Sequence, residues 1–337
     1  MHWSRSDERI VAVRRRLGDG PWARQQLLAA GWSARQIERD LQQGRLERVI
    51  RGVYAPTGVV LAWDAPQTYA PPILGAGDDA AVSFESAAAI RRMWIPYPAD
   101  PRIHLSSSGR PVTYDPVVRR HRTHLRDDDV DVLAGVRVTS VARTAVDLAR
   151  GKAFAQALAP LDSATRILAL GEAAHSAAGR VLLARPGARR RVDAALGELR
   201  AAAGRIAGGR GTRELVRCLE QVDPRSESPY ESWCRGELVS AGVRIEALGL
   251  EVRGASGRLY YADFAWPSLR LIAEADGVEK YGSDLRTVRE RVMAERHRQR
   301  DLEDAGWEFV RWTAGEPALV FTARVARALA AATARSA

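Results

Sequence analysis

Cysteine and long apolar runs are both scarce in this chain. Only Cys218 and Cys234 occur among 337 residues, and they do not form a CxxC pair. This usage argues against a disulfide scaffold or a cysteine-ligated zinc site and favours reduced thiols in a cytosol. No stretch approaches the roughly 18 consecutive apolar residues that span a bilayer, and the charged start lacks an apolar signal-peptide core. We therefore expect a cytoplasmic protein with no membrane partner.

Acidic residues are in deficit. The formal net charge is +10, which favours anionic partners, nucleic acid first and a membrane surface second. This positive charge is compatible with nucleic-acid binding but does not require it. The chain is rich in Ala and Arg and has lysine only at Lys152 and Lys280, so a general bias in composition could supply the charge. Hydrophobic residues make up 46% of the chain, which is ordinary for a globular protein, and the length favours two or three domains.

The first 57 residues carry the pattern of three short helices followed by a β-hairpin. Apolar spacing predicts helices over 7–17 and 22–30, and the capping-box form of Ser33 and Gln36 opens a third helix over 33–43. Gly44 stands where a helix ends, and Gly52 divides two runs of strand formers. This order is the plan of a winged helix-turn-helix, in which the third helix enters the major groove.

Candidate DNA contacts follow from this plan. On the third helix, Arg35, Gln36 and Arg39 are residue types that contact guanine, adenine and phosphate. On or beside the wing, Arg45, Arg48 and Arg51 are placed for phosphate contacts. Residues 1–55 hold eleven arginines against six acidic residues, half of the excess charge of the whole chain. The alternative is a winged helix that contacts protein.

The run QLLAAGWSARQIERDLQQGRLERVIRGVYAP resembles the N-terminal domain of AbiEi-type antitoxins of type IV toxin–antitoxin systems. The resemblance covers about residues 5–57, and its most specific part runs from Gly44 to Tyr54. It implies promoter-DNA binding. The segments VSFESAAAIRRM and VRVTSVARTAVDLAR resemble the second domain of the same proteins, which implies toxin neutralisation or further DNA contacts.

The middle of the chain offers little chemistry. Strands are expected near 102–105 and 117–122, and a strand followed by a helix over 136–150. The three histidines there, His104, His121 and His124, lack ligand spacing on one element, and we predict no metal site from them. Residues 151–222 are expected to be a helical connector. Its RPGARRRVD cluster could contact phosphate, but a solvated face is favoured.

The last third predicts an α/β domain. Ser228, Pro229 and Glu231 start a helix. Strands follow at 243–248, 250–253, 260–266 and 269–276, then a long polar helix over 284–305, a strand over 307–313 and a final helix. Asp263 lies on one strand, and Glu274 and Asp276 end the next on one side. Carboxylates that converge in this way repel one another unless a cation neutralises them, and oxygen ligands of this kind suit Mg²⁺. Such a metal can activate water for phosphodiester cleavage. Lys280 could assist by stabilising charge that develops on the phosphate.

The D-x10-E-x-D spacing resembles the core of PD-(D/E)XK nucleases, in particular the Vsr-like branch, over about residues 226–313. The resemblance implies that Asp263 and Glu274 bind the metal, that Glu231 is the acidic residue of the first helix, and that Glu295 and Arg298 lie on the polar helix beside the site. Asp276 stands where the motif has lysine, which puts cleavage in doubt. Glu231 could instead be only a helix cap, Asp263 a hydrogen-bonding strand end, and Lys280 a loop charge.

These patterns predict a multi-domain α+β protein. The expected parts are a winged helix-turn-helix (1–57), an antitoxin-like α/β middle domain (58–150), a helical connector (151–222) and a nuclease-type mixed sheet flanked by helices (223–337). The leading hypothesis is a DNA-binding protein that cleaves phosphodiesters with Mg²⁺ as a possible endonuclease. The alternative is a non-cleaving regulator or antitoxin, and a third class is a toxin-binding partner with little DNA role.

Overall fold

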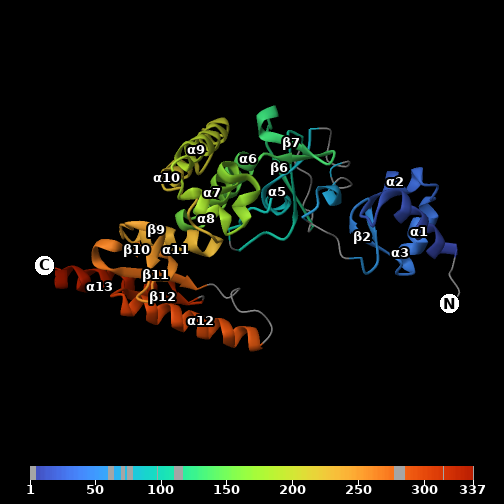
Figure 1. Ribbon diagram of the computed structural model, residues 1–337. Helices are drawn as coiled ribbons and strands as arrows, with labels where there is room; N and C mark the ends of the chain where they lie inside the picture. Colours follow the sequence, from blue (N-terminus) through green and yellow to red (C-terminus); the bar gives the residue numbers. More distant parts are fainter. Residues whose placement is uncertain are drawn as a thin grey trace. The chain divides into compact units, whose positions relative to one another are not determined.

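The computed structural model describes residues 5–59, 64–69, 73, 79–96, 98–109, 117–276, 285–313 and 315–336. The chain forms two compact units. Met1–Met93 and Pro98–Leu148 make the first unit, and Trp94–Tyr97 and Ala149–Ala337 make the second (Figure 1). Within the described residues the strands form three sheets alongside many helices. The expected α+β class is therefore confirmed, and each unit is described separately below.

The first unit begins with helices and a small sheet. Its elements are α1 (Arg5–Leu17), β1 (Trp22–Ala23), α2 (Arg24–Ala29), α3 (Ala34–Gln42), β2 (Leu46–Ile50) and β3 (Val53–Pro56), with the strands in the order β1-β3-β2. Trp22, Leu27 and Trp32 lie in its core. The expected helix over 22–30 was wrong at its start, because Trp22 and Ala23 pair with Tyr54 and Val53 as a third strand. A buried aromatic favours a strand.

The local signals of the third helix and the hairpin hold in the structure. The Ser33 hydroxyl accepts from the Gln36 N–H at 3.3 Å, and the Gln36 side chain accepts from the Ser33 N–H at 2.7 Å, which completes the predicted capping box. Gly44 follows α3 with φ of +64°, and Gly52 turns the β2–β3 hairpin with φ of +81°. Such angles favour glycine, since a Cβ would be strained there. The winged-helix plan of helices and hairpin is thus present.

The rest of the first unit is a mixed sheet with helices. The strands are β4 (Ala81–Val82), β5 (Ile103–Ser107), β6 (Val118–Arg122), β7 (Val130–Leu133) and β8 (Val136–Thr139), in the order β6-β5-β4-β8-β7. Short 3-10 turns η1 (Pro66–Tyr69) and η2 (Asp127–Asp129) and helices α5 (Phe84–Ile90) and α6 (Val141–Ala149) complete it. Ser140 caps α6, because its hydroxyl accepts from the Arg143 N–H.

Helices form the first part of the second unit. They are α7 (Phe154–Leu170), η3 (Gly171–His175), α8 (Ala178–Leu183), α9 (Ala188–Arg205) and α10 (Thr212–Glu220). Helix α7 is buried along most of its length, with Leu158, Leu161 and Ala164 fully inaccessible. It packs against α9, α10 and α11 (Pro229–Ser240). Segment 151–222 is therefore helical as expected. Its first helix, α7, packs in one core with α11, which lies outside the segment.

The second unit continues as a sheet between helices. Strands β9 (Ala247–Arg253), β10 (Leu259–Trp266) and β11 (Leu271–Asp276) run antiparallel in succession, and β12 (Glu308–Thr313) pairs parallel to β11. The turn η4 (Pro267–Leu269) joins β10 to β11, α12 (Leu285–Asp304) precedes β12, and α13 (Ala318–Ser336) follows it. The separate strand expected over 243–248 was wrong, because only its last two residues belong to β9.

Apolar side chains fill both faces of this sheet. Phe264, Leu271 and Trp312 pack with α11 and α13 residues on one face. Ala265 and Ile272 pack with Leu302 of α12 on the other. Neighbours in sequence therefore serve opposite faces, as the pleat of a strand requires. The result is a sheet between two helical layers, which places the charged residues of β10, β11 and α12 at one location.

Candidate nucleic-acid interface and acidic site

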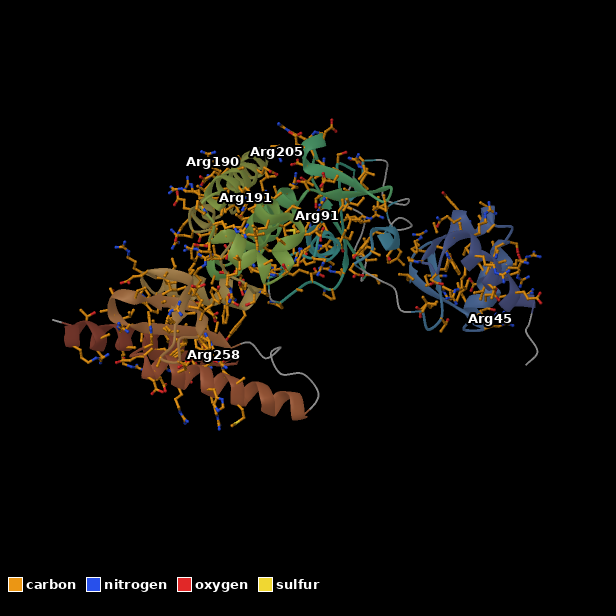
Figure 2. The ribbon with its side chains drawn as sticks, in the orientation of Figure 1. Arg45, Arg91, Arg190, Arg191, Arg205 and Arg258 are labelled. Carbon is orange, nitrogen blue, oxygen red and sulfur yellow. The ribbon has the colours of Figure 1, made fainter. Side chains whose placement is uncertain are left out.

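Helix α3, which the sequence predicts to enter the major groove, presents two arginines to solvent. Arg35 and Arg39 are both exposed on α3, whereas Ile37 faces the core. Arg48 on β2 and Arg51 at the hairpin turn are exposed as well. Figure 2 draws the side chains of this part of the chain. Four of the six predicted DNA-contact residues are thus available to a phosphate or a base edge.

The other two predicted contacts are engaged within the fold. The Gln36 side chain closes the capping box of α3. Arg45, labelled in Figure 2, donates through Nε at 2.9 Å to Asp40, a carboxylate that is fully buried. A buried carboxylate requires a partner, and Arg45 supplies it. DNA contacts by Gln36 and Arg45 stay predictions, and the structure gives each of these side chains a local role.

The second unit brings the predicted carboxylates of β10 and β11 to one end of the sheet. Phe264 pairs with Ala273, so Asp263 and Glu274 are the next residues along the two strands. The Asp263 carboxylate accepts from the Ala275 N–H at 3.0 Å, which ties β10 to β11. Asp263 therefore has a hydrogen-bonding role, as in the alternative given for it, but it lies inside β10 and not at the end of the strand.

Glu274 is held by arginines. Its side chain is only 3% exposed, and Arg298 of α12 donates to both of its oxygens at 2.8 and 2.5 Å. Arg311, its register partner on β12, lies 3.6 Å from the same carboxylate. Glu295 contacts both arginines at 2.8 and 2.7 Å. We call Glu274, Glu295, Arg298 and Arg311 the arginine–glutamate network, in which two positive and two negative charges balance.

The network shifts the titration of its members. Burial acts to lower the pKa of Arg298, but its hydrogen bonds to Glu274 and the charge of both glutamates outweigh it, and the pKa rises above its ordinary value. Burial likewise acts to raise the pKa of Glu295, yet Arg311 and Arg298 bring it below the usual range. Both side chains therefore stay charged around neutral pH.

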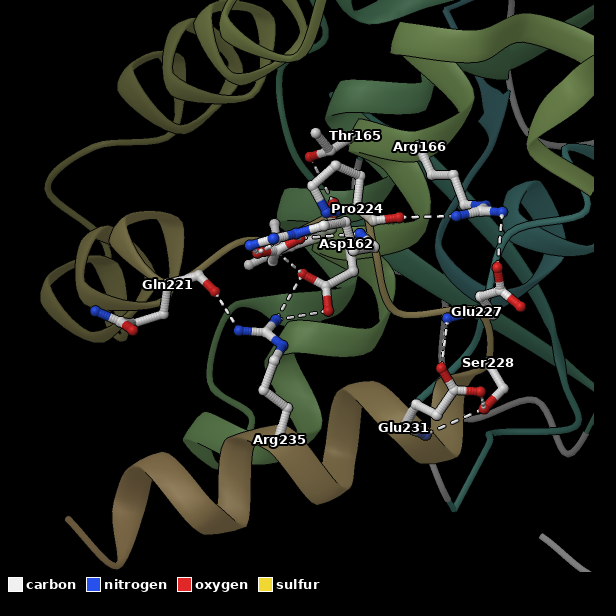
Figure 3. Close-up of polar contacts among 12 residues, drawn as sticks. Asp162, Thr165, Arg166, Gln221, Pro224, Glu227, Ser228, Glu231 and Arg235 are labelled. Carbon is white, nitrogen blue, oxygen red and sulfur yellow. Dashed lines mark hydrogen bonds and ion pairs between the residues drawn. The ribbon is translucent and has the colours of Figure 1, made fainter. Parts of the chain in front are cut away.

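Glu231 caps its own helix, as the sequence alternative has it. It accepts from the Glu227 N–H at 2.7 Å and from the Ser228 hydroxyl at 3.0 Å (Figure 3). It also faces the site. Burial, followed by the charges of Asp263 and Glu231, raises the pKa of Cys234 well above its ordinary value. The two carboxylates thus act on the same buried thiol from α11 and β10.

A second arginine group surrounds these carboxylates. Arg180 of α8 forms an ion pair with Glu227 and stacks over the Tyr261 ring at 4.3 Å. Burial lowers the pKa of Arg180, but Glu227, Glu231 and Asp263 together raise it above its ordinary value. Arg166 of α7 lies 3.9 Å from Glu227. Sequence patterns gave no sign of Arg166, Arg180 or Arg311 at this site, because each comes from a different element.

Helix α7 anchors the site to the rest of the second unit. Arg235 of α11 donates to both oxygens of the inaccessible Asp162 at 2.8 and 2.6 Å, and Arg166 donates to the Pro224 carbonyl at 2.9 Å (Figure 3). Burial raises the pKa of Asp162, although Arg235 opposes that shift. The position of Glu231 is therefore fixed through α11 and α7 together.

The described carboxylates do not present a divalent-cation site in this arrangement. Both oxygens of Glu274 accept from one guanidinium, and Asp263 accepts from a backbone N–H. Among the described residues, no group of three or more His, Cys, Asp or Glu side chains has the geometry of a metal site. Asp276 ends β11, but its side chain lies outside the described residues, as does the whole of Lys280.

Two of the three histidines considered from the sequence do meet in the first unit. His104 Nδ1 lies 3.0 Å from His121 Nε2, and Phe84 stacks on the His121 ring. Glu85 and Asp100 lie 3.2 and 3.6 Å from the His104 ring nitrogens. His124 is exposed and takes no part in the pair. His104 is buried and His121 is half-buried, and the Phe84 ring packs against the pair.

Among the described helices, none is both long enough and apolar enough to cross a membrane. This agrees with the absence of long apolar runs in the sequence.

Comparison with known proteins bears on the front of the chain. Residues 24–57 match the family described as "Transcriptional regulator, AbiEi antitoxin". That stretch contains α2, α3 and the β2–β3 hairpin, and it falls within the segment whose sequence resembled these antitoxins. The N-terminal residues 24–57 are therefore similar to an antitoxin-regulator domain, and the match gives no support to a Vsr-like nuclease in the rest of the chain.

Two relatives from Mycobacterium tuberculosis are similar over a longer stretch. They are "Uncharacterized protein MT2308" of strain CDC 1551 / Oshkosh and "Uncharacterized protein Rv2248" of strain H37Rv, each 30% identical over 178 residues. The similarity covers 53% of this chain and 55% of each relative, so the chain spans about half the length of the proteins it matches. The crystal structure of the RV2827C protein of the same organism is 17% identical with a TM-score of 0.34, covering 75% of this chain and 89% of that one.

Proposed function

We propose that this protein is a DNA-binding transcriptional regulator of the antitoxin kind, which places α3 in the major groove of promoter DNA. The observation that carries the proposal is the match of residues 24–57 to the AbiEi antitoxin regulators. The exposed Arg35 and Arg39 on α3, with Arg48 and Arg51 on the hairpin, supply the groups that such binding needs. Antitoxins act on a toxin, so the proposal includes a cognate toxin protein as partner.

The arginine–glutamate network supports a C-terminal domain that binds but does not cleave. A nuclease metal needs carboxylate oxygens directed at the cation. Here Arg298 takes both oxygens of Glu274, and Arg311 lies close behind. Mg²⁺ could reach Glu274 only after Arg298 had left a buried, bidentate ion pair, and breaking such a pair is costly. Among the carboxylates whose side chains the structure describes, Glu274 and Asp263 are both engaged in hydrogen bonds.

A metal-dependent endonuclease is the second candidate, and one observation favours it. The order α11-β9-β10-β11-α12-β12, with β9 to β11 antiparallel and β12 parallel to β11, is the arrangement expected of a PD-(D/E)XK core. In that case Asp263 and Glu274 would bind Mg²⁺ after Arg298 had moved away. Fold likeness alone does not assign an activity, so this candidate ranks second.

DNA binding is tested with a duplex taken from upstream of the protein's own gene. Arg35→Gln with Arg39→Gln is expected to weaken binding by about 100-fold, since lost base and phosphate contacts each cost about 1–3 kcal/mol. The matched control is Arg15→Gln with Arg16→Gln, exposed arginines of α1. Equal affinities of the wild type and both double variants would refute the regulator proposal.

Cleavage is tested on supercoiled and linear DNA with Mg²⁺ or Mn²⁺. We expect no nicking by the wild type, and none by Asp263→Ala or Glu274→Ala, while all three bind DNA alike. Metal-dependent nicking that disappears in both variants would establish the endonuclease instead. Nicking that persists in both variants would indicate a contaminating enzyme.

A further inference from the structure

Arginines gather on the two helices that precede α11. Residues 185–217 hold nine arginines against three acidic residues, and most of these arginines lie on α9 and α10. The two helices pack against each other and α9 also packs against α7. We call the exposed members of this group, on and beside these helices, the α9–α10 basic surface: Arg185, Arg189, Arg190, Arg191, Arg200, Arg210, Arg213 and Arg217.

The positive charge of this surface is little neutralised by its own acids. Arg189 lies 4.0 Å from Asp193, with side chains 91% and 66% exposed, and Arg217 lies 3.5 Å from a half-exposed Glu214. Exposed pairs at such distances contribute little. Figure 2 labels Arg190 and Arg191 on α9, which with Arg189 place three exposed guanidinium groups within one turn of the helix. An anion at this surface meets positive charge that the neighbouring carboxylates leave largely unbalanced.

Buried apolar residues explain why these helices pack in the unit, but they do not explain the exposed arginines. Helix α9 is fixed in the second unit by Ala195, Leu199 and Ala202, which are almost inaccessible. Arg189, Arg190, Arg191 and Arg200 of the same helix are exposed instead. Exposed arginines of one sign over two adjacent helices match the regular phosphates of duplex DNA, as guanidinium groups bind phosphate in fork geometry.

We infer that the α9–α10 basic surface is a second DNA-backbone contact, separate from the recognition helix and without base specificity. The inference rests on the proposed DNA-binding function and deepens it. The recognition helix selects the site, and the basic surface raises the affinity for any duplex that the protein already holds. Such contacts release counterions, so they increase the salt dependence of binding.

The test measures binding of the full chain to a random-sequence DNA duplex of several helical turns across a range of salt concentrations. The variant is Arg189→Gln, Arg190→Gln and Arg191→Gln, because glutamine keeps the helix propensity. We expect affinity to fall about tenfold at low salt, and the slope of log affinity against log salt to shrink by about 0.9 for each lost phosphate contact.

Two further variants separate the possible outcomes. Arg244→Gln, Arg258→Gln and Arg296→Gln removes the same charge from scattered exposed positions of the same unit, and Arg35→Gln with Arg39→Gln disables the recognition helix. An α9 variant that binds like the wild type, while the recognition-helix variant is weakened, overturns the second contact alone. A scattered variant as weak as the α9 variant also overturns it. Wild type that binds no DNA refutes the proposed function as well.

An anionic membrane is the competing occupant. Vesicles of phosphatidylserine and phosphatidylcholine are added to the wild type and to the α9 variant. Vesicle binding lost in the α9 variant, with DNA binding unchanged, would overturn the assignment to DNA.

Discussion

Glu274 is a buried carboxylate whose surroundings decide what it can do. With 3% of its side chain exposed, it depends on Arg298 and Arg311 for compensation. Removing one partner of a buried pair leaves a charge without solvent or counterion, which costs more than the pair itself contributes. Substitutions of Arg298 on α12 and of His121 in the histidine pair both test what it costs to bury a charge.

Arg298→Gln is expected to lower the free energy of unfolding by about 2–4 kcal/mol, because Glu274 then keeps only the more distant Arg311. Urea denaturation measures this change. Arg300→Gln is the control, an exposed arginine of the same helix, with an expected change below about 0.5 kcal/mol. Adding Glu274→Gln to Arg298→Gln should recover part of the loss. Equal effects of the two single substitutions would contradict the role given to Arg298.

The histidine pair predicts a loss of stability in acid. Burial, then the neighbouring charges of His104 and Arg119, lowers the pKa of His121 to about 3, and burial also lowers that of His104 despite Glu85 and Asp100. An unfolded histidine titrates near pH 6.5, so protons bind the unfolded chain first as pH falls. Stability is therefore full above about pH 6.5 and declines towards pH 3.

At about pH 5 the expected loss relative to neutral pH is roughly 1–2 kcal/mol from His121, and His104 adds to it in the same direction. Thermal melting between these pH values measures it. His121→Gln should flatten the profile, whereas His124→Gln, at an exposed position, should leave it unchanged. A profile that stays the same in the His121 variant would show that other groups cause the acid sensitivity.

At the scale of the elements, helices α7 and α11 approach each other closely at a glycine. A Cβ on Gly236 of α11 would lie 2.4 Å from Ala155 Cα and 2.7 Å from Ala155 Cβ on α7. The two backbones approach here because neither residue has a large side chain. The Asp162–Arg235 ion pair lies on the same two helices, so their spacing also positions the acidic site.

Gly236→Ala is expected to destabilise the protein by about 1–3 kcal/mol through overpacking, although alanine is the better helix former. Gly197→Ala is the matched control, since Gly197 lies inside α9 with nothing within 4 Å of its Cβ position. There the helix propensity acts alone, and we expect a gain of about 0.5–1 kcal/mol. Chemical denaturation distinguishes the two signs, and a gain at Gly236 would contradict the packing.

Sequence patterns predicted most of the helices and strands, but few of the contacts between residues far apart in the sequence. Periodicity and caps located α3, α11, β10 and α12, because these depend on neighbours in the chain. Trp22 was placed in a helix, since its strand partner Tyr54 lies far along the sequence. The nuclease resemblance placed Arg298 beside the site, whereas Arg311, the second partner of Glu274, was missed. Arg311 reaches it through the parallel β11–β12 register, and no local pattern specifies that register.

At the scale of the whole molecule, neither compact unit is a continuous stretch of the sequence. The stretch Trp94–Tyr97 lies in the middle of the first unit's sequence but belongs to the second unit. Its Trp94 N–H donates at 3.1 Å to the hydroxyl of Ser163, a buried residue of α7. The second unit therefore depends on residues that precede its main segment by about 50 positions.

A fragment of residues 149–337 should accordingly unfold at a lower temperature than the same unit within the full chain, by several degrees for a loss of about 1 kcal/mol. Circular dichroism during heating gives both transitions. Ser163→Ala in the full chain serves as comparison, because it removes the acceptor and keeps the segment. Identical transitions for the fragment and the full chain would contradict the dependence.

The path of the chain between the units also constrains how such a protein can be inherited. Because Trp94–Tyr97 returns to the second unit, the chain crosses between the units after residues 93, 97 and 148. A single recombination event at any one of these points leaves a unit without part of its own sequence. The two compact units therefore have to be passed on together, because no single break in the chain separates one from the other.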